Sequence, residues 1–199
     1  MSLVDLCKVG ELQEVKAALQ RGVDVNTKGK DGDLEKGESF LERWSRCQHN
    51  GWTGLIWAVE NNHNSVVELL LNTPNIDFNL TSVWGSCALH DAVRCNNNEG
   101  LKQLLKIPNI DVDIVNIDGR NALHWAVREN NIEALKLLLG HPNLTTLTLN
   151  QKDKKYGATP VMLAVIMNRL EHLDLLVADP RVDLDTTDWK GRSLEEVAR

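Results

Sequence analysis

The sequence lacks any dense run of basic residues, and this excludes whole classes of partner. Its 199 residues carry 22 lysines and arginines against 28 aspartates and glutamates, for a formal net charge of −6. Binding to nucleic acid or to an anionic membrane surface depends on clustered positive charge. We therefore expect neither nucleic acid nor a membrane among the partners of this chain.

Long apolar runs are missing as well. The longest are short, such as the three leucines at 69–71, whereas a helix that spans a bilayer needs about 20 apolar residues. The N-terminal segment carries acidic side chains where a secretory signal would be apolar, and it reads as an amphipathic helix. These features predict a soluble, cytoplasmic chain in a reducing compartment.

Cysteines and most aromatic residues are scarce. The four cysteines are spaced in no pattern typical of a disulfide framework, so free thiols are expected. There are six tryptophans but only one tyrosine and two phenylalanines. A core would normally use phenylalanine at least as freely as tryptophan, so the positions of the tryptophans carry information.

Motifs of catalysis are missing too. The sequence contains no phosphate-binding loop, no nucleophile elbow and no His-Glu-x-x-His metal motif. The adjacent carboxylates Glu195 and Glu196 are typical of a solvated surface rather than of an acid–base pair. We therefore expect no enzymatic activity, no cofactor and no bound metal.

What the sequence has instead is a repeat. Gly51 begins the block Gly-Trp-Thr-Gly-Leu-Ile-Trp-Ala, which recurs in altered form from Gly85, Gly119 and Gly157, with a partial copy from Gly191. These glycines are 34, 34, 38 and 34 residues apart. A leucine-rich block follows each full copy, and a block such as Pro-Asn-Ile-Asp follows that. Self-similarity at this period is the signature of a repeat architecture.

A single unit of the repeat predicts two helices and a loop. Leu55, Val66 and Leu70 belong to apolar sets at helical spacing, with an asparagine-rich break between the two sets. Pro74 ends the second helix because it cannot continue it. Residues 76–84 alternate in polarity before the next glycine, which favours an extended, hairpin-like finger. No unit can bury its own apolar face, so the units must stack.

These motifs resemble the ankyrin repeat. The family pattern Gly-x-Thr-Pro-Leu-His-x-Ala is nearly complete at Gly157, Thr159, Pro160 and Ala164 and partial in the other copies. The resemblance implies an all-α, ankyrin-type solenoid of stacked helix-turn-helix units with extended finger loops. It also implies a non-catalytic module that binds a protein partner through its concave face, which in this family is lined by the finger tips and the first helix of each unit.

The resemblance divides the chain as a single ankyrin-repeat domain over residues 1–199. The expected segments are an N-terminal cap at 2–27, an insertion at 28–50, repeats at 51–84, 85–118, 119–156 and 157–190, and a C-terminal cap at 191–199. Four extra residues lengthen the finger before Gly157, and its lysine-rich run at 150–155 is interpreted as a solvated tip.

The insertion at 28–50 interrupts the array. A capping-box pattern followed by Phe40, Leu41 and Trp44 at helical spacing predicts a short helix near 39–47. This helix either folds back and packs on the array or forms a second partner-binding element, in which those three residues make the contacts.

Most tryptophans fall at positions that line the concave face in the ankyrin family. Interface hot spots are enriched in Trp, Tyr and Arg, and rigid aromatic anchors lose little rotamer freedom on binding. The expected partner-binding residues are Trp52, Trp57, Glu60, Trp84, Asp91, Arg94, Arg120, Trp125, Arg128, Glu129, Tyr156, Ile166 and Met167. Trp57 and Trp125 have an alternative role as core between first helices, and Trp189 is a further candidate beside its glycine.

Two other function classes stay open. Thiolates and imidazoles bind zinc, so a metal-binding or redox role could use the cluster of Cys47, His49, Cys87, His90 and Cys95. Cys87 and His90 nevertheless occupy the family's Thr and His positions, and the resemblance implies that His90 and His124 hydrogen-bond neighbouring finger loops. A purely structural spacer is the third possibility. We expect a monomer rather than a homo-oligomer, and its origin fits either a natural module or an engineered, library-selected binder.

Overall fold

The computed structural model describes residues 2–29 and 51–198, and it divides into two compact units, residues 1–92 and 93–199. The described residues form twelve α-helices and, in place of strands, two isolated β-bridges. The all-α class that the repeat pattern predicts is therefore confirmed.

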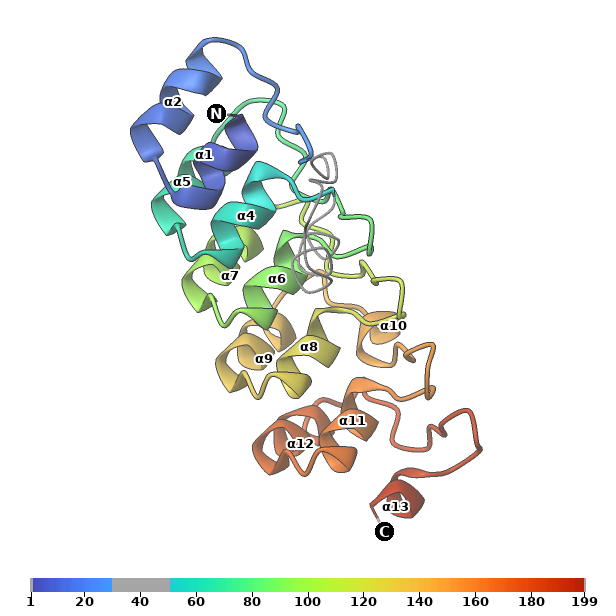
Figure 1. Ribbon diagram of the computed structural model, residues 1–199. Coiled ribbons are helices and arrows are strands. Elements are labelled where there is room, and N and C mark those ends of the chain that lie inside the picture. The colour runs from blue at the N-terminus through green and yellow to red at the C-terminus, as the bar shows by residue number, and fades with distance from the viewer. Residues whose placement is uncertain (1, 30–50, 199) are drawn as a thin grey trace. The chain divides into compact units, whose positions relative to one another are not determined.

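The first unit consists of two helix pairs and the start of a third (Figure 1). α1 (Leu3–Val9) and α2 (Leu12–Gln20) form one pair, and α4 (Gly54–Glu60) and α5 (Asn64–Leu71) form the next. α1 packs on α4 and α2 packs on α5, so the first and second helices form separate layers. α6 (Ala88–Arg94) begins in this unit and ends in the second. The predicted helix near 39–47, with Phe40, Leu41 and Trp44, lies outside the described residues.

The second unit repeats the two layers. Its helices are α7 (Asn98–Leu105), α8 (Ala122–Arg128), α9 (Ile132–Leu139), α10 (Thr146–Leu149), α11 (Pro160–Ile166), α12 (Leu170–Val177) and α13 (Leu194–Val197). α11 packs between α8 and α13 in the layer of first helices, while α9 contacts both α7 and α12 in the layer of second helices. The four extra residues before Gly157 are accommodated by the short helix α10, which leads into the finger (Figure 1), and by one additional residue in the turn at Gly157.

Side-chain caps and left-handed asparagines set the helix boundaries. Four helices begin after a capping residue whose side-chain oxygen accepts a hydrogen bond from the backbone N–H three residues later, at 3.2–3.4 Å. These capping residues are Thr53, Asn121, Thr159 and Ser193. A cap of this kind stabilises a helix by about 1 kcal/mol. Between the two helices of a repeat, the chain turns at Asn62, Asn96, Asn130 and Asn168, which have φ between 52° and 60°. Asparagine tolerates this left-handed conformation better than most residues do.

Small and branched apolar residues build the contacts between neighbouring repeats. Ala58, Ala126 and Ala164 are fully buried on first helices, where their small side chains let the adjacent helix approach. Leu135 and Leu176 are fully buried on second helices. Truncating such a leucine to alanine costs about 2–5 kcal/mol. This stack fixes the positions from which the finger loops extend.

Candidate functional site

Four finger loops end in similar turns, of which the one that contains Gly157 is one residue longer than the others. The backbone N–H groups of Ser82, Asn116, Asp153 and Asp188 donate across the tip to the carbonyls of Ser86, Arg120, Ala158 and Arg192 at 2.8–3.1 Å. The repeat glycine inside each turn has φ between 72° and 77°, at Gly85, Gly119, Gly157 and Gly191. Glycine adopts this left-handed region without steric cost. The recurring glycine of the sequence therefore reflects a turn that each finger needs.

In each of the last three tips, a side-chain oxygen also accepts hydrogen bonds from backbone N–H groups of the turn. Asn116 Oδ1 accepts two backbone hydrogen bonds, both at 3.0 Å. Asp153 Oδ1 accepts three, from the N–H groups of Tyr156, Gly157 and Ala158 at 2.8, 3.0 and 3.3 Å. Asp188 Oδ1 accepts two, at 2.8 and 2.9 Å. These contacts fix the backbone of the tips.

Two of these tips also contain ion pairs. Asp153 Oδ2 lies 3.2 Å from Arg120 Nη2, and Asp188 Oδ2 lies 2.7 Å from Arg192 Nη2. Burial opposes ionisation of both aspartates, but hydrogen bonds from backbone N–H groups and from the arginines outweigh it and hold each pKa below its ordinary value. The run at 150–155 is therefore not simply a solvated tip, because Asp153 is a buried anchor within it.

The last two fingers lie against each other and present aromatic rings. The Trp189 backbone N–H donates to the Tyr156 carbonyl at 2.9 Å, and the indole Nε1–H donates to the Lys154 carbonyl at 3.2 Å. Both rings stay accessible, since Trp189 is 60% and Tyr156 50% exposed. The ammonium of Lys152 lies 5.3 Å from the Trp189 ring centroid, and that of Lys155 lies 4.9 Å from the Tyr156 ring centroid. We call this set the lysine–aromatic patch: Lys152, Lys154, Lys155, Tyr156, Trp189 and Lys190.

The other predicted residues of the second unit include five on or just after α8 and α11. Trp125 is half-buried, with Arg128 Cζ 5.3 Å from its ring centroid. Arg128 is exposed and its Nε lies 3.7 Å from a Glu129 carboxylate oxygen. Ile166 is 48% exposed, and Met167 is half-buried. Because α8 and α11 pack side by side, these residues share the layer of first helices.

In the first unit the predicted residues separate into buried and exposed ones. Trp52 and Asp91 are only 4% and 2% exposed, so neither presents its side chain to solvent as a partner-binding residue would. The Trp52 ring packs on that of Trp57, with centroids 4.8 Å apart, and Lys8 Nζ lies 4.4 Å from the Trp57 ring centroid. Trp84, at its finger tip, is 41% exposed. The remaining predicted residues of the chain, Glu60, Arg94 and Arg120, are half-buried.

His124 has a structural role of the kind that the resemblance implies. Its Nδ1 lies 2.7 Å from Asn121 Oδ1, and its Nε2 lies 3.1 Å from the Ala158 carbonyl oxygen. The ring thus connects the start of α8 to the finger of the following repeat. His124 is 1% exposed, so it does not contribute to a surface site.

The thiol–imidazole cluster considered as a metal or redox site is only partly within the described residues. Cys87 Sγ lies 3.1 Å from His90 Nδ1, and burial raises the pKa of the thiol to about 12. A thiol with this pKa is protonated near neutral pH and is a poor metal ligand or nucleophile. No group of three His, Cys, Asp or Glu residues within 2–29 and 51–198 could hold a metal ion. Cys47 and His49 lie outside those ranges.

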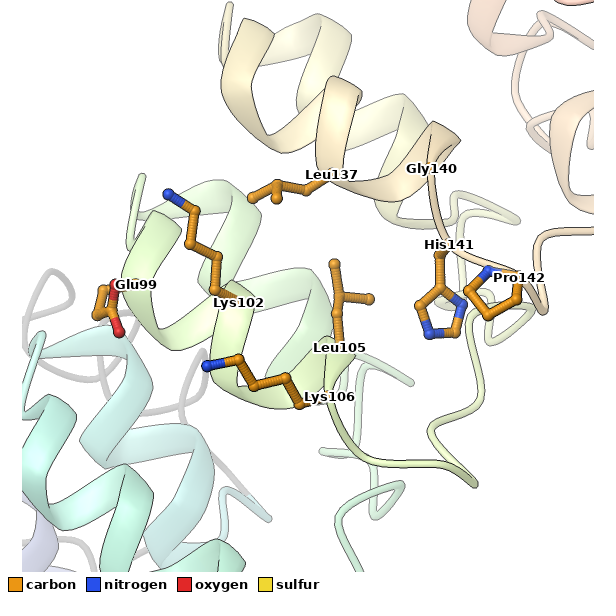
Figure 2. Close-up of a pocket in the computed structure, with 8 residues that line it drawn as sticks. All are labelled: Glu99, Lys102, Leu105, Lys106, Leu137, Gly140, His141 and Pro142. Atoms are coloured by element: carbon orange, nitrogen blue, oxygen red, sulfur yellow. The ribbon is translucent and has the colours of Figure 1, made fainter.

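Open pockets occur between second helices. One, of about 420 Å³, lies between α7 and α9 and is lined by Lys102, Lys106, Leu105, Leu137 and His141 among others (Figure 2). Another, of about 450 Å³, lies between α2 and α5. Because the two pockets occupy the same place in different repeats, they follow from helix stacking and do not mark a specialised site.

Sequence reasoning missed the environment of Trp189. The sequence placed this residue beside its glycine, but the hydrogen bonds to Tyr156 and Lys154 connect positions more than thirty residues apart. The lysine-rich run at 150–155 was the available signal. Its meaning depends on the neighbouring finger, which a local pattern does not reveal.

Comparison with known proteins gives one family match. The family model described as ankyrin repeats (3 copies) matches residues 3–116 and 89–188. No curated protein matches the sequence. None of the helices in the described part of the chain combines the length and apolar character that crossing a bilayer requires.

Proposed function

The chain belongs to the ankyrin-repeat family, and we propose that it is a non-catalytic module that binds a protein partner through its first helices and finger tips. Ankyrin repeats generally mediate protein–protein interaction. The observation that carries the proposal is the exposure of aromatic rings at finger tips, 41% for Trp84, 50% for Tyr156 and 60% for Trp189. Such rings are the side chains that most often dominate binding energy at interfaces.

The layer of first helices supplies further contacts. In the second unit, Arg128 and Glu129 provide charge, while Ile166 and Met167 provide apolar area on the adjacent helix. Trp125 supports Arg128 through the contact of its ring with the guanidinium. Isolated exposed apolar residues are common on any protein, so only the whole set of charged and apolar side chains supports an interface here.

Buried residues of the predicted set take supporting roles in this proposal. Trp52 packs under Trp57 and so fixes the half-buried ring that faces Lys8. Asp91 is buried within α6. Substituting either residue would change the fold of its repeat as well as any interface, so neither is suitable for a binding test.

The proposal is tested by affinity capture with a surface variant, Trp84→Ala, Arg128→Ala, Ile166→Ala. Its matched control carries Glu68→Ala, Lys102→Ala and Leu170→Ala on second helices. We expect the unmodified chain and the control to capture the same partner. When the purified partner is titrated, the surface variant should bind it at least about tenfold more weakly than the other two proteins do. Equal thermal midpoints of the three proteins make the comparison valid.

The other outcomes favour the rival functions. A partner held equally by all three proteins would move the interface away from the first helices and finger tips. Absence of any partner would support a structural spacer. Stoichiometric zinc in the purified protein would support the metal-binding hypothesis, and Cys47 and His49 would then be the first ligands to substitute.

A further inference from the structure

We infer that the lysine–aromatic patch binds an acidic segment of a protein chain that carries an apolar residue beside its carboxylates. The inference rests on the proposed function, and it names the chemical class of the partner at one part of that surface. Three properties of the patch support it: its local charge, its exposed rings and its fixed backbone.

The charge of the patch is opposite to that of the chain. The aspartates held inside the two tips are paired with arginines, Asp153 with Arg120 and Asp188 with Arg192. In contrast, Lys152, Lys154, Lys155 and Lys190 have no carboxylate within salt-bridge distance among the described residues. The other carboxylates nearest in sequence are Asp183 and Asp185, four residues or more before Trp189, and Glu195 and Glu196, five and six residues after Lys190. A chain with a formal net charge of −6 thus presents a local excess of ammonium groups.

The exposed rings add an apolar component to this cationic surface. A backbone hydrogen bond joins Trp189 to Tyr156, so the two rings extend from adjacent backbone segments. Each ring has an ammonium within about the range of a cation–π contact, from Lys152 and Lys155 respectively. A partner that offers both carboxylates and an apolar side chain would satisfy both components.

The backbone of the patch is already fixed before binding. Asp153 accepts three backbone hydrogen bonds at its tip and Asp188 accepts two. The Trp189 indole is held by its hydrogen bond to the Lys154 carbonyl. Binding to a preorganised surface loses less conformational entropy than binding to a mobile loop.

A flexible nucleic acid strand fits this surface less well. It too would use cations and aromatic rings, but its phosphates continue in both directions along the backbone. The patch is confined to two finger tips, and the exposed Asp183 and Asp185 lie earlier in the second of these fingers. A short acidic peptide can end its charge where the patch ends.

The test uses a displayed library of random linear peptides, selected on the full chain. The patch variant is Lys154→Gln, Lys155→Gln, Lys190→Gln. The control variant, Lys102→Gln, Lys106→Gln, Lys136→Gln, makes the same change in charge on α7, at the residue that follows it and on α9 of the same unit. Synthetic versions of the enriched peptides are then measured by fluorescence anisotropy at low and high salt.

We expect enrichment of peptides rich in Asp and Glu with at least one apolar residue. Their affinity should fall about tenfold in the patch variant, since three exposed charge contacts each contribute a few-fold, and should change less than about twofold in the control variant. It should also fall as salt screens the contacts. Tyr156→Ala removes only the ring, because the backbone of Tyr156 makes the hydrogen bonds there, and it should weaken binding by about tenfold or more.

Several outcomes would overturn the inference. Enrichment of neutral or basic peptides, or acidic peptides that bind the patch variant as well as the unmodified chain, would refute it while leaving the proposed protein-binding function intact. A library that yields no binders would also refute it, and only the additional failure of partner capture would refute the proposed function. Binding of a 20-nucleotide oligo-dT strand that is lost in the patch variant would assign the surface to nucleic acid instead.

Discussion

The finger that ends at Gly119 and the finger that ends at Gly157 close with similar turns, the second one residue longer, and different side chains hold them. A neutral amide, Asn116, holds the first tip, whereas a carboxylate, Asp153, holds the second. The carboxylate accepts one more backbone hydrogen bond and also pairs with Arg120 of the preceding finger. The comparison shows that the side chain that holds a tip can act within its own turn, as Asn116 does, or can also form an ion pair with the neighbouring finger, as Asp153 does.

The two fingers also differ in length, and the difference is absorbed locally. The longer finger contains α10, whose first turn is capped by Thr145 Oγ1 accepting from the Thr148 N–H at 3.1 Å. The Thr148 hydroxyl also hydrogen-bonds the carboxylate of Asp113 in the shorter finger. Four additional residues thus create extra contacts between fingers instead of a loose loop.

Removing the side-chain acceptor at each tip should give the largest difference between the two fingers in the free energy of unfolding that is lost. Asp153→Ala leaves three backbone N–H groups and the guanidinium of Arg120 without this partner, and we expect a loss of about 3 kcal/mol in the free energy of unfolding. Asn116→Ala leaves two N–H groups without theirs and should cost about 1–2 kcal/mol. Urea denaturation followed by circular dichroism measures both.

A double variant separates the ion pair from the turn. If the Arg120 contact contributes, Asp153→Ala combined with Arg120→Ala should be less destabilising than the sum of the two single substitutions. Simple additivity of the two would mean that the ion pair is not coupled to the tip. Equal costs for Asp153→Ala and Asn116→Ala would remove the distinction between the fingers.

Adding a methyl group at the two glycines should give the next largest effect. At Gly157 a Cβ would lie 2.7 Å from the Trp189 backbone nitrogen, whereas at Gly119 it would lie 3.0 Å from Lys154 Cγ and 3.2 Å from its nitrogen. Both glycines have left-handed φ, which costs a non-glycine residue about 1 kcal/mol. We expect Gly157→Ala to cost about 3 kcal/mol and Gly119→Ala about 2 kcal/mol. Thermal denaturation ranks them, and a reversed order would show that the last finger yields more easily than its backbone contact suggests.

The sequence predicted the features that depend on short-range pattern. The first helices begin after Thr53, Asn121 and Thr159, as the family's block implies, because a cap acts within three residues. The glycines fall at left-handed turns for an equally local reason. Repeat spacing then predicts which helices stack, so the fold class and the finger positions follow from the sequence.

Burial that depends on distant residues was not predictable in this way. Asp153 is part of a lysine-rich run that resembles solvent-exposed sequence, yet its partner Arg120 lies thirty-three residues earlier. Trp52 occupies a position beside the repeat glycine that suggests exposure, but its ring is covered and packs on Trp57. In both cases the environment is set by side-chain packing between segments, on which the repeat pattern carries no information.

Stability in acid should distinguish the carboxylate of Asp153 from an amide at the same position. The folded-state pKa of Asp153 is below its ordinary value near 3.8 because hydrogen bonds outweigh burial. Its contribution to stability is therefore fully present above that ordinary value and is lost as the pH falls through the lower folded-state pKa. Asp113 acts in the opposite direction, since burial raises its pKa. We expect Asp153→Asn to cost about 1 kcal/mol at pH 7 and to lose less further stability than the unmodified chain between pH 5 and pH 2.

The measurement is urea denaturation at several pH values, with Asn116→Ala as the control. The control keeps every carboxylate of the chain, so its free energy of unfolding should change with pH in parallel with that of the unmodified chain. If the free energy of unfolding of Asp153→Asn also changed in parallel with that of the unmodified chain, the ion pair and the tip hydrogen bonds would not favour the ionised form of Asp153.

The smallest effect should come from making the shorter finger resemble the longer one. Asn116→Asp keeps an oxygen acceptor for the two N–H groups at its tip, but it adds a third carboxylate near Arg120, which already contacts Asp118 and Asp153. One guanidinium cannot compensate three carboxylates fully, while stronger hydrogen bonds to a charged acceptor offset part of the repulsion. We therefore expect a change within about 0.5 kcal/mol at pH 7 and a steeper loss of stability in acid. A large stabilisation at pH 7 would mean that the amide in the natural finger is a compromise. A large destabilisation would mean that Arg120 is already saturated by Asp153, and that the coupling between fingers depends on the neutral tip beside it.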